Sequence, residues 1–376
     1  MDIPFAESLL AWQVHRLARR HPVRPLGEFQ LKETRQVLVT LTTGIGDAVF
    51  SSAVFPALRT AMPQAHITLF CREAWLDLFS DDPAIDEIIP YPGKFRHFFS
   101  TLKALRTSRP DLALVLHGND PDIIPLCYLA GAPTILRIPV RGTRFDYLLS
   151  NRNRTEDNDS LPGLHYVDNR LRILDTLGIS QAGYAPQLHV NPGRRKRILE
   201  ELEPSLKGRP YIVIHPRAAD RYKSLPDALL VDLLAQLRNC LQTHCIVLTG
   251  GNAERADLET LLGRQNDPQV FLAAGRWGLA DTAACLAGAS AVIGPDTGVL
   301  HMAAALDRPV LGLYSPTQAT LVGPRAPHAP VTVLEQPLTC TPCYQKRCPH
   351  RPVKCMAQFD AQTVTGALLT LLGPAP

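Results

Sequence analysis

The chain has 376 residues, of which 45% are apolar and 20% charged, and its formal net charge is +4. These proportions are typical of globular proteins, and they exclude wholesale disorder and a bundle of membrane-spanning helices. The small net charge gives no reason to expect a nucleic acid as partner. At roughly 150 residues per domain, the length predicts two domains.

Short apolar segments alternate with helix-like segments in the first half of the chain. Strands are predicted at 36–41, 66–70, 87–90, 111–116 and 134–138, and helices near 48–61, 95–108 and 166–178. A polar, turn-prone stretch over 151–165 interrupts this pattern.

The pattern resumes beyond a stretch at 185–197 that is rich in Pro, Gly and basic residues, which we interpret as a linker. Further strands are predicted at 211–214, 245–248, 270–273, 291–293 and 310–313, and a last helix at 361–372. Strands that alternate with helices indicate parallel sheets covered on both faces. We therefore predict an α/β protein with two Rossmann-like domains that face each other across a cleft. The expected parts are a first domain at 1–185, a second domain at 186–357 and a C-terminal helix within 358–376.

The loop after the first strand carries Gly44, Gly46 and Asp47. It is not a nicotinamide fingerprint, because Val49 stands where the third glycine should be and no acid ends the second strand. Asp47 therefore has two interpretations. It is either the N-cap of the following helix or a base whose ionised form the helix N-terminus favours.

The loop 294–301 (GPDTGVLH) follows a buried strand and opens a helix. Its backbone N–H groups suit a diphosphate, and the Thr297 hydroxyl can add a donor. His301 lies one turn further along the helix, on the face of Thr297. Asp296 could instead cap the helix.

Two more loops follow predicted strands. Loop 215–226 contains Arg217, Arg221 and Lys223, which either neutralise an anion or are simply solvated. Loop 249–254 contains Gly250 and places Glu254 at a helix start, where its carboxylate could hold ribose hydroxyls or interact with the helix dipole.

Four cysteines, Cys340, Cys343, Cys348 and Cys355, lie within one short segment. Four thiolates so close together suit a structural zinc or iron ion. Reduced thiols and reversible disulfides are the alternatives.

Together these loops resemble the heptosyltransferases of the lipopolysaccharide core, which form glycosyltransferase family 9 and have the two-domain GT-B fold. The resemblance runs from about residue 36 to 372, and its most specific part is the segment 294–301. It implies that the domain 1–185 binds the acceptor and that the domain 186–357 binds the nucleotide sugar. It further implies that Asp47 is the general base, that Lys223 contacts the donor phosphates and that Glu254 holds the nucleoside. Donor contacts are further expected at Thr43, Gly44, Gly46, Arg217, Gly250, Asp296, Thr297, Gly298 and His301. A related branch that glycosylates autotransporter proteins binds iron at a similar cysteine group.

The implied reaction is an inverting transfer of heptose from ADP-L-glycero-D-manno-heptose to a lipopolysaccharide inner-core acceptor. Catalysis is expected to need no metal, since Lys223 and backbone N–H groups can stabilise the departing diphosphate. One alternative is a protein heptosyltransferase of the autotransporter type. Another is a non-catalytic protein that binds a nucleotide sugar.

An anionic acceptor would need cations in the first domain, and Lys94 and Arg137 are among the candidates. Residues 5–20 are predicted to form a basic amphipathic helix, which either rests on the inner membrane or packs against the domain. The start of the chain is acidic, unlike a secretory signal, so we expect a cytoplasmic protein with peripheral membrane contact as one option.

Overall fold

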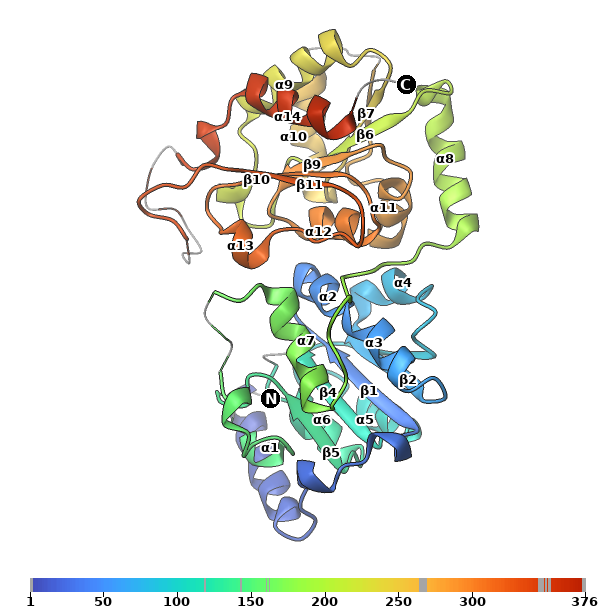
Figure 1. Cartoon of the computed structure of the whole chain (residues 1–376), viewed down its shortest axis with the longest axis vertical. Coiled ribbons are helices and arrows are strands. Elements are labelled where there is room, and N and C mark those ends of the chain that lie inside the picture. The colour runs from blue at the N-terminus through green and yellow to red at the C-terminus, as the bar shows by residue number, and fades with distance from the viewer. Residues whose placement is uncertain are drawn as a thin grey trace. The chain divides into compact units, whose positions relative to one another are not determined.

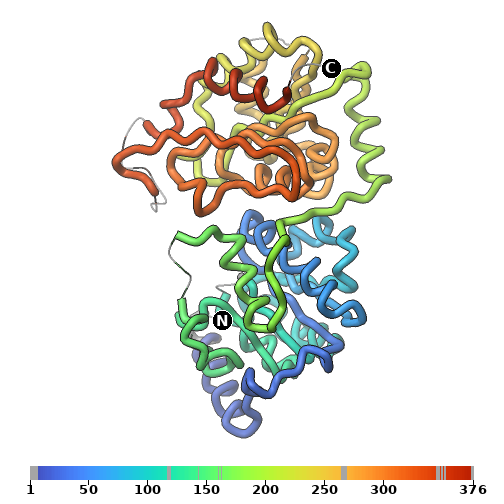
Figure 2. The backbone as a smooth tube through the Cα atoms, in the orientation of Figure 1, coloured from blue at the N-terminus to red at the C-terminus, as the bar shows by residue number. Residues whose placement is uncertain are grey.

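The computed structural model describes residues 3–117, 120–142, 144–159, 161, 163–263, 269–343, 348, 350 and 353–373. The chain divides into two compact units, Met1–Pro186 and Gln187–Pro376. In Figures 1 and 2 the first unit runs from blue to green and the second from green to red.

The first unit is built on a parallel sheet with the strand order β3-β2-β1-β4-β5. Its strands are β1 (Gln36–Leu41), β2 (His66–Arg72), β3 (Glu87–Tyr91), β4 (Leu112–His117) and β5 (Thr134–Arg137). These bounds confirm the five predicted strands to within two residues. The strands are almost continuously apolar because helices cover the sheet.

The helices of this unit are α1 (Ile3–Ala18), α2 (Ile45–Ser51), α3 (Val54–Ala61), α4 (Leu76–Phe79), α5 (Phe98–Thr107), α6 (Ile123–Leu129) and α7 (Tyr166–Thr176). The single helix expected near 48–61 is wrong, since α2 and α3 are separate. At the junction the Ser51 hydroxyl donates to the Asp47 carbonyl oxygen, and the Ser52 hydroxyl donates to that of Val49. Such bonds compete with the helical pattern and favour a break.

The second unit has a six-stranded parallel sheet with the order β11-β10-β9-β6-β7-β8. Its strands are β6 (Tyr211–Ile214), β7 (Cys245–Leu248), β8 (Val270–Leu272), β9 (Val292–Pro295), β10 (Val310–Tyr314) and β11 (Val331–Glu335). Five of them were predicted. Strand β11 was not, because it lies at the edge of the sheet and none of its residues is fully buried.

Its helices are α8 (Pro192–Leu206), α9 (Asp227–Cys240), α10 (Arg255–Gly263), α11 (Leu279–Leu286), α12 (Gly298–Ala305), α13 (Ala319–Val322) and α14 (Ala361–Leu372). The linker expected at 185–197 is therefore wrong beyond residue 191. Asn191 caps α8 by accepting hydrogen bonds from the N–H groups of Gly193 and Arg194, and Pro192 takes the first helical position. Both residue types are favoured at these places.

The last helix, α14, packs into the core of the second unit. Val364 and Leu368 belong to the same buried cluster as Leu230 and Leu234 of α9. The apolar face of α14 is thus covered by α9.

Both sheets contain a point at which the strand order reverses. It lies between β1 and β4 in the first unit and between β6 and β9 in the second. The chain leaves neighbouring strands in opposite directions there, so the loops part and leave room for a ligand. The segments that follow β1 and β4 flank the first reversal point, and those that follow β6 and β9 flank the second.

Gly294 allows the two strands at the second reversal point to approach closely. A Cβ atom on this residue would lie 2.9 Å from the backbone carbonyl oxygen of His215. Real Cβ atoms do not come so near to a backbone oxygen, so a larger residue would push β9 and β6 apart.

We predict that Gly294→Ala destabilises the second unit by about 1–3 kcal/mol, the usual range for overpacking a tight site. The matched control is Gly366→Ala in α14, where an added Cβ would meet nothing within 4 Å. That change should stabilise by up to about 1 kcal/mol, because alanine favours helix. Urea unfolding followed by circular dichroism measures both, and equal midpoints for the two variants would contradict the prediction.

Candidate functional site

Asp47 lies at the reversal point of the first sheet, in the first turn of α2. The N-cap of α2 is Gly44, so Asp47 does not cap the helix. Its Oδ1 accepts a hydrogen bond from Nη2 of Arg170 on α7 at 3.1 Å. The Asp47 side chain is 27% exposed and that of Arg170 only 8%. A half-buried carboxylate thus meets a buried guanidinium.

Arg170 is absent from the sequence predictions. Burial lowers the pKa of its guanidinium, and the charge and hydrogen bond of Asp47 act in the opposite direction. The signal that could have revealed it is its position in α7, whose buried residues Val167, Leu171 and Leu174 lie on the same face. A charged residue within an apolar stripe usually has a buried partner.

A second charged group joins the ends of β2, β3 and β4. The buried Asp120 carboxylate lies 3.5 Å from Nη2 of Arg72 and 3.5 Å from Nζ of Lys94. Arg72 also donates through Nε to the carbonyl oxygen of Thr42, just after β1. Both cations are well exposed, so this edge of the sheet presents positive charge to solvent. Of the predicted acceptor cations, Lys94 lies here, whereas Arg137 is buried at the end of β5.

Asp122 connects two of the segments that form this edge of the sheet. Its carboxylate accepts hydrogen bonds from the Tyr91 hydroxyl and the Phe95 N–H, each at 2.8 Å. Burial raises the pKa of Asp122, although these hydrogen bonds oppose the shift. The contacts tie the loop after β3 to the loop after β4.

The second reversal point holds a compact group of Lys223, Asp296 and His301. Lys223 Nζ lies 2.8 Å from Asp296 Oδ2, and His301 Nε2 lies 3.3 Å from Asp296 Oδ1. Burial would raise the pKa of the Asp296 carboxyl, but His301 and Lys223 together hold it well below its usual range. Three predicted residues from loops 73 residues apart are thus brought together around one carboxylate.

The start of α12 completes this group. Thr297 is the N-cap, and its hydroxyl oxygen accepts from the Leu300 N–H, so Asp296 is not the cap. Gly298 is the first residue of the helix, and the His301 N–H donates to the Thr297 carbonyl oxygen. The positive end of α12 therefore lies next to the Lys223 ammonium.

Glu254 and Gly250 lie in the loop after β7. The Glu254 carboxylate accepts a hydrogen bond from the Gly251 N–H, while the Gly250 carbonyl oxygen accepts from the Gly275 N–H. Nearby, His215 Nδ1 and Thr249 Oγ1 are 3.1 Å apart, which connects the loops after β6 and β7. Burial lowers the pKa of His215 to about 4, so its ring is neutral at pH 7.

Arg217 makes its contacts within its own loop and the next helix. Nη1 donates to the Leu225 carbonyl oxygen at 2.9 Å, and Nη2 lies 2.5 Å from Asp227 Oδ1. Thr43, Gly44 and Gly46 form the turn from β1 into α2 and belong to the first unit with Asp47.

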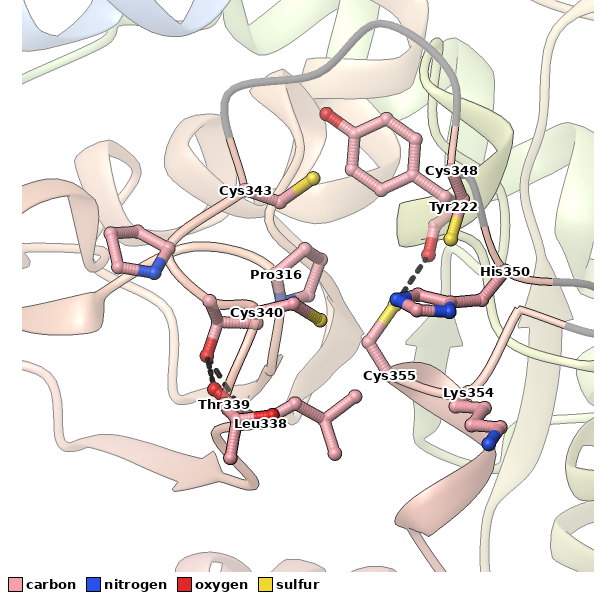
Figure 3. A pocket seen from close by; sticks show the side chains of 12 residues that line it. Tyr222, Pro316, Leu338, Thr339, Cys340, Cys343, Cys348, His350, Lys354 and Cys355 are labelled. Atoms are coloured by element: carbon pink, nitrogen blue, oxygen red, sulfur yellow. Dashed lines mark hydrogen bonds between the residues drawn. The ribbon is translucent and has the colours of Figure 1, made fainter.

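The four clustered cysteines line one pocket of about 430 Å³, together with Tyr222 and His350 (Figure 3). No disulfide joins any of the nine cysteines, all of which are among the described residues. Within the described part of the chain, no three His, Cys, Asp or Glu side chains are placed to hold a metal ion.

The expectation of a structural zinc or iron site is therefore not supported. Cys355 illustrates the physical reason. Its buried thiol donates a hydrogen bond to the Tyr222 carbonyl oxygen at 3.4 Å.

Comparison with known proteins identifies the family. A model of glycosyltransferase family 9 (heptosyltransferase) matches residues 101–354. The chain is 27% identical to lipopolysaccharide heptosyltransferase 2 of Salmonella typhimurium over 311 residues, which are 77% of this chain and 85% of that protein.

Two solved structures share the fold. A glycosyl transferase family 9 protein from Veillonella parvula gives a TM-score of 0.75 at 20% identity, over 92% of this chain and 98% of that one. The ADP-heptose lipopolysaccharide heptosyltransferase II of E. coli gives 0.72 at 24% identity, over 90% and 98%. With two parallel α/β sheets of the GT-B type and a family match over 101–354, this protein belongs to glycosyltransferase family 9, the heptosyltransferases, and is a glycosyltransferase.

Proposed function

We propose that the protein transfers heptose, with inversion, from ADP-L-glycero-D-manno-heptose to a lipopolysaccharide inner-core acceptor. The observation that carries this proposal is the group of Lys223, Asp296 and His301 at the start of α12. It offers a cation and a helix N-terminus at one place, as a nucleoside diphosphate requires. The names of the relatives support heptose as the sugar and ADP as the nucleotide.

The donor would bind to the second unit. Its diphosphate would accept hydrogen bonds from Lys223 and from backbone N–H groups at Thr297 and Gly298, and Glu254 would exchange the Gly251 N–H for ribose hydroxyls. As the bond to the anomeric carbon breaks, its electron pair leaves with ADP. Lys223 would stabilise that growing negative charge, the work that a bound divalent cation could otherwise do.

Asp47 would act as the general base. Its carboxylate takes the proton of the acceptor hydroxyl while the hydroxyl oxygen forms the new bond to the anomeric carbon. One displacement of this kind inverts the configuration at that carbon. The ion pair with Arg170 supports the role, because the buried guanidinium holds the carboxylate at 3.1 Å while the Asp47 side chain is the more exposed of the two.

We predict that Asp47→Asn lowers kcat by at least 100-fold, the usual contribution of a general base, and leaves the affinity for ADP unchanged. Asp77→Asn, on the exposed side of α4, is the matched control and should keep full turnover. Heptose transfer to a purified lipid acceptor and calorimetry with ADP provide the two readouts. Near-normal turnover of Asp47→Asn would exclude this base.

We also propose that α1 brings the enzyme to the cytoplasmic face of the inner membrane. One side of the helix packs in the core through Leu10, Ala11 and Val14. The other side exposes Trp12 and Leu9, with large apolar surfaces left open to solvent. Among the described residues, no helix has the length and apolar character to cross a bilayer.

Positive charge accompanies these exposed apolar side chains. Arg16 lies 6.0 Å from the centre of the Trp12 ring, and Arg19 and Arg20 follow at the exposed end of the helix. A tryptophan beside arginines is typical of helices that lie in the interface of an anionic membrane. The sequence left two interpretations of this helix, packing against the domain and contact with the membrane. We propose that one side of α1 does the first and the other side does the second.

Replacing Arg16, Arg19 and Arg20 by Gln should weaken binding to vesicles of anionic phospholipid by about 100-fold, at about 1 kcal/mol per charge. Trp12→Ala should also weaken it, whereas Phe99→Ala, which removes an even more exposed ring from α5, should have no effect. Vesicle co-sedimentation at low salt measures all three. Unchanged binding of the triple variant would show that α1 is not the contact.

A further inference from the structure

We propose that Arg170 is the positioning residue of the catalytic base: it fixes the direction of the Asp47 carboxylate. The inference rests on the proposed role of Asp47. It begins from the hydrogen bond of 3.1 Å between Arg170 Nη2 and Asp47 Oδ1, which connects residues 123 positions apart in the chain.

The two side chains occupy different depths. Arg170 is 8% exposed and Asp47 is 27% exposed, so the guanidinium lies behind the carboxylate as seen from solvent. A substrate hydroxyl would therefore approach Asp47 and not Arg170. This arrangement suits a residue that acts on the reaction only through its neighbour.

Aromatic packing between α2 and α7 holds the pair in place. Phe50 lies three residues after Asp47, on the same face of α2, and Tyr166 lies four residues before Arg170, on the same face of α7. The Phe50 ring meets the rings of Tyr166 and His165 edge-on, at 6.4 and 5.8 Å between centres. Each helix thus presents one ring and one charge to the other.

The ring of Tyr166 also supports the guanidinium directly. The Arg170 Cζ atom lies 6.0 Å from the centre of that ring, within the range of a cation–π interaction. His165 caps α7 by accepting from the Val167 N–H, so the first turn of the helix is fixed. The guanidinium of Arg170 thus lies against the Tyr166 ring and holds the Asp47 carboxylate by its hydrogen bond.

The charge of Arg170 is expensive to bury. Its Nε atom is buried without a hydrogen-bond partner among the described residues, and a second buried guanidinium, that of Arg137, repels it. Buried charges persist where an opposite charge compensates them, and the Asp47 carboxylate is the acid that pairs with Arg170. A neutral leucine or methionine would fill this place at lower cost, which indicates that the charge serves the site.

The expected result is a loss of turnover without a loss of donor binding. Arg170→Met should lower kcat by about 10- to 100-fold, because a misdirected base is a weak one, while the ADP affinity stays unchanged. Arg170→Lys, which keeps the charge, should recover part of that loss.

Arg172→Met is the matched control. Arg172 lies on the same helix, but its guanidinium donates to the carbonyl oxygens of Glu156 and Asp159, away from Asp47. Its loss should lower the melting temperature while kcat stays within about threefold of the parent.

A double variant separates positioning from a structural role. In the background of Asp47→Asn there is no base left to position, so Arg170→Met should cause little further loss of kcat. A full, additive loss in the double variant would overturn the inference, and so would normal turnover of Arg170→Met. If Asp47→Asn alone keeps normal turnover, the proposed base fails, and this inference fails with it.

Discussion

An opposite charge beside a carboxylate that is partly withdrawn from water stabilises it, and one such ion pair lies at the strand-order reversal of each unit. Asp47 meets Arg170 at the end of β1, and Asp296 meets Lys223 at the end of β9. Each pair lies where the strand order of its sheet reverses. Since the loops part at such points, the fold supplies the space and the ion pairs supply the chemistry.

The two pairs differ in a way that matches two different tasks. Around Asp296, a lysine and a histidine lie beside the N-terminus of α12, whose backbone N–H groups favour an anionic ligand. Around Asp47 the cation is buried and the carboxylate is the more exposed partner, so the negative charge is the group that a substrate meets. We propose that the first holds the diphosphate of a sugar donor and the second removes the proton of the acceptor.

Much of this could be predicted from the sequence because it depends on local patterns. Apolar runs and the glycine turns located the strands and their loops, and the segment around Asp296 indicated the family. The apolar stripe of α7 could have marked Arg170 as buried, but its pairing with Asp47 could not be predicted, because the two are 123 residues apart and no local rule connects them. The expectation of a metal is not supported for a related reason: closeness in sequence does not by itself place ligands around one point. Among the described residues no three potential ligands are so placed, and the thiol of Cys355 donates to a backbone oxygen.

A crystal structure of the protein with ADP and a sugar acceptor would test the account most directly. We predict that the diphosphate oxygens lie within hydrogen-bond distance of Lys223 Nζ and the Gly298 N–H, and that the acceptor hydroxyl donates a hydrogen bond to the Asp47 carboxylate. A diphosphate held instead by Arg72 and Lys94 in the first unit, or an acceptor bound far from Asp47, would contradict it.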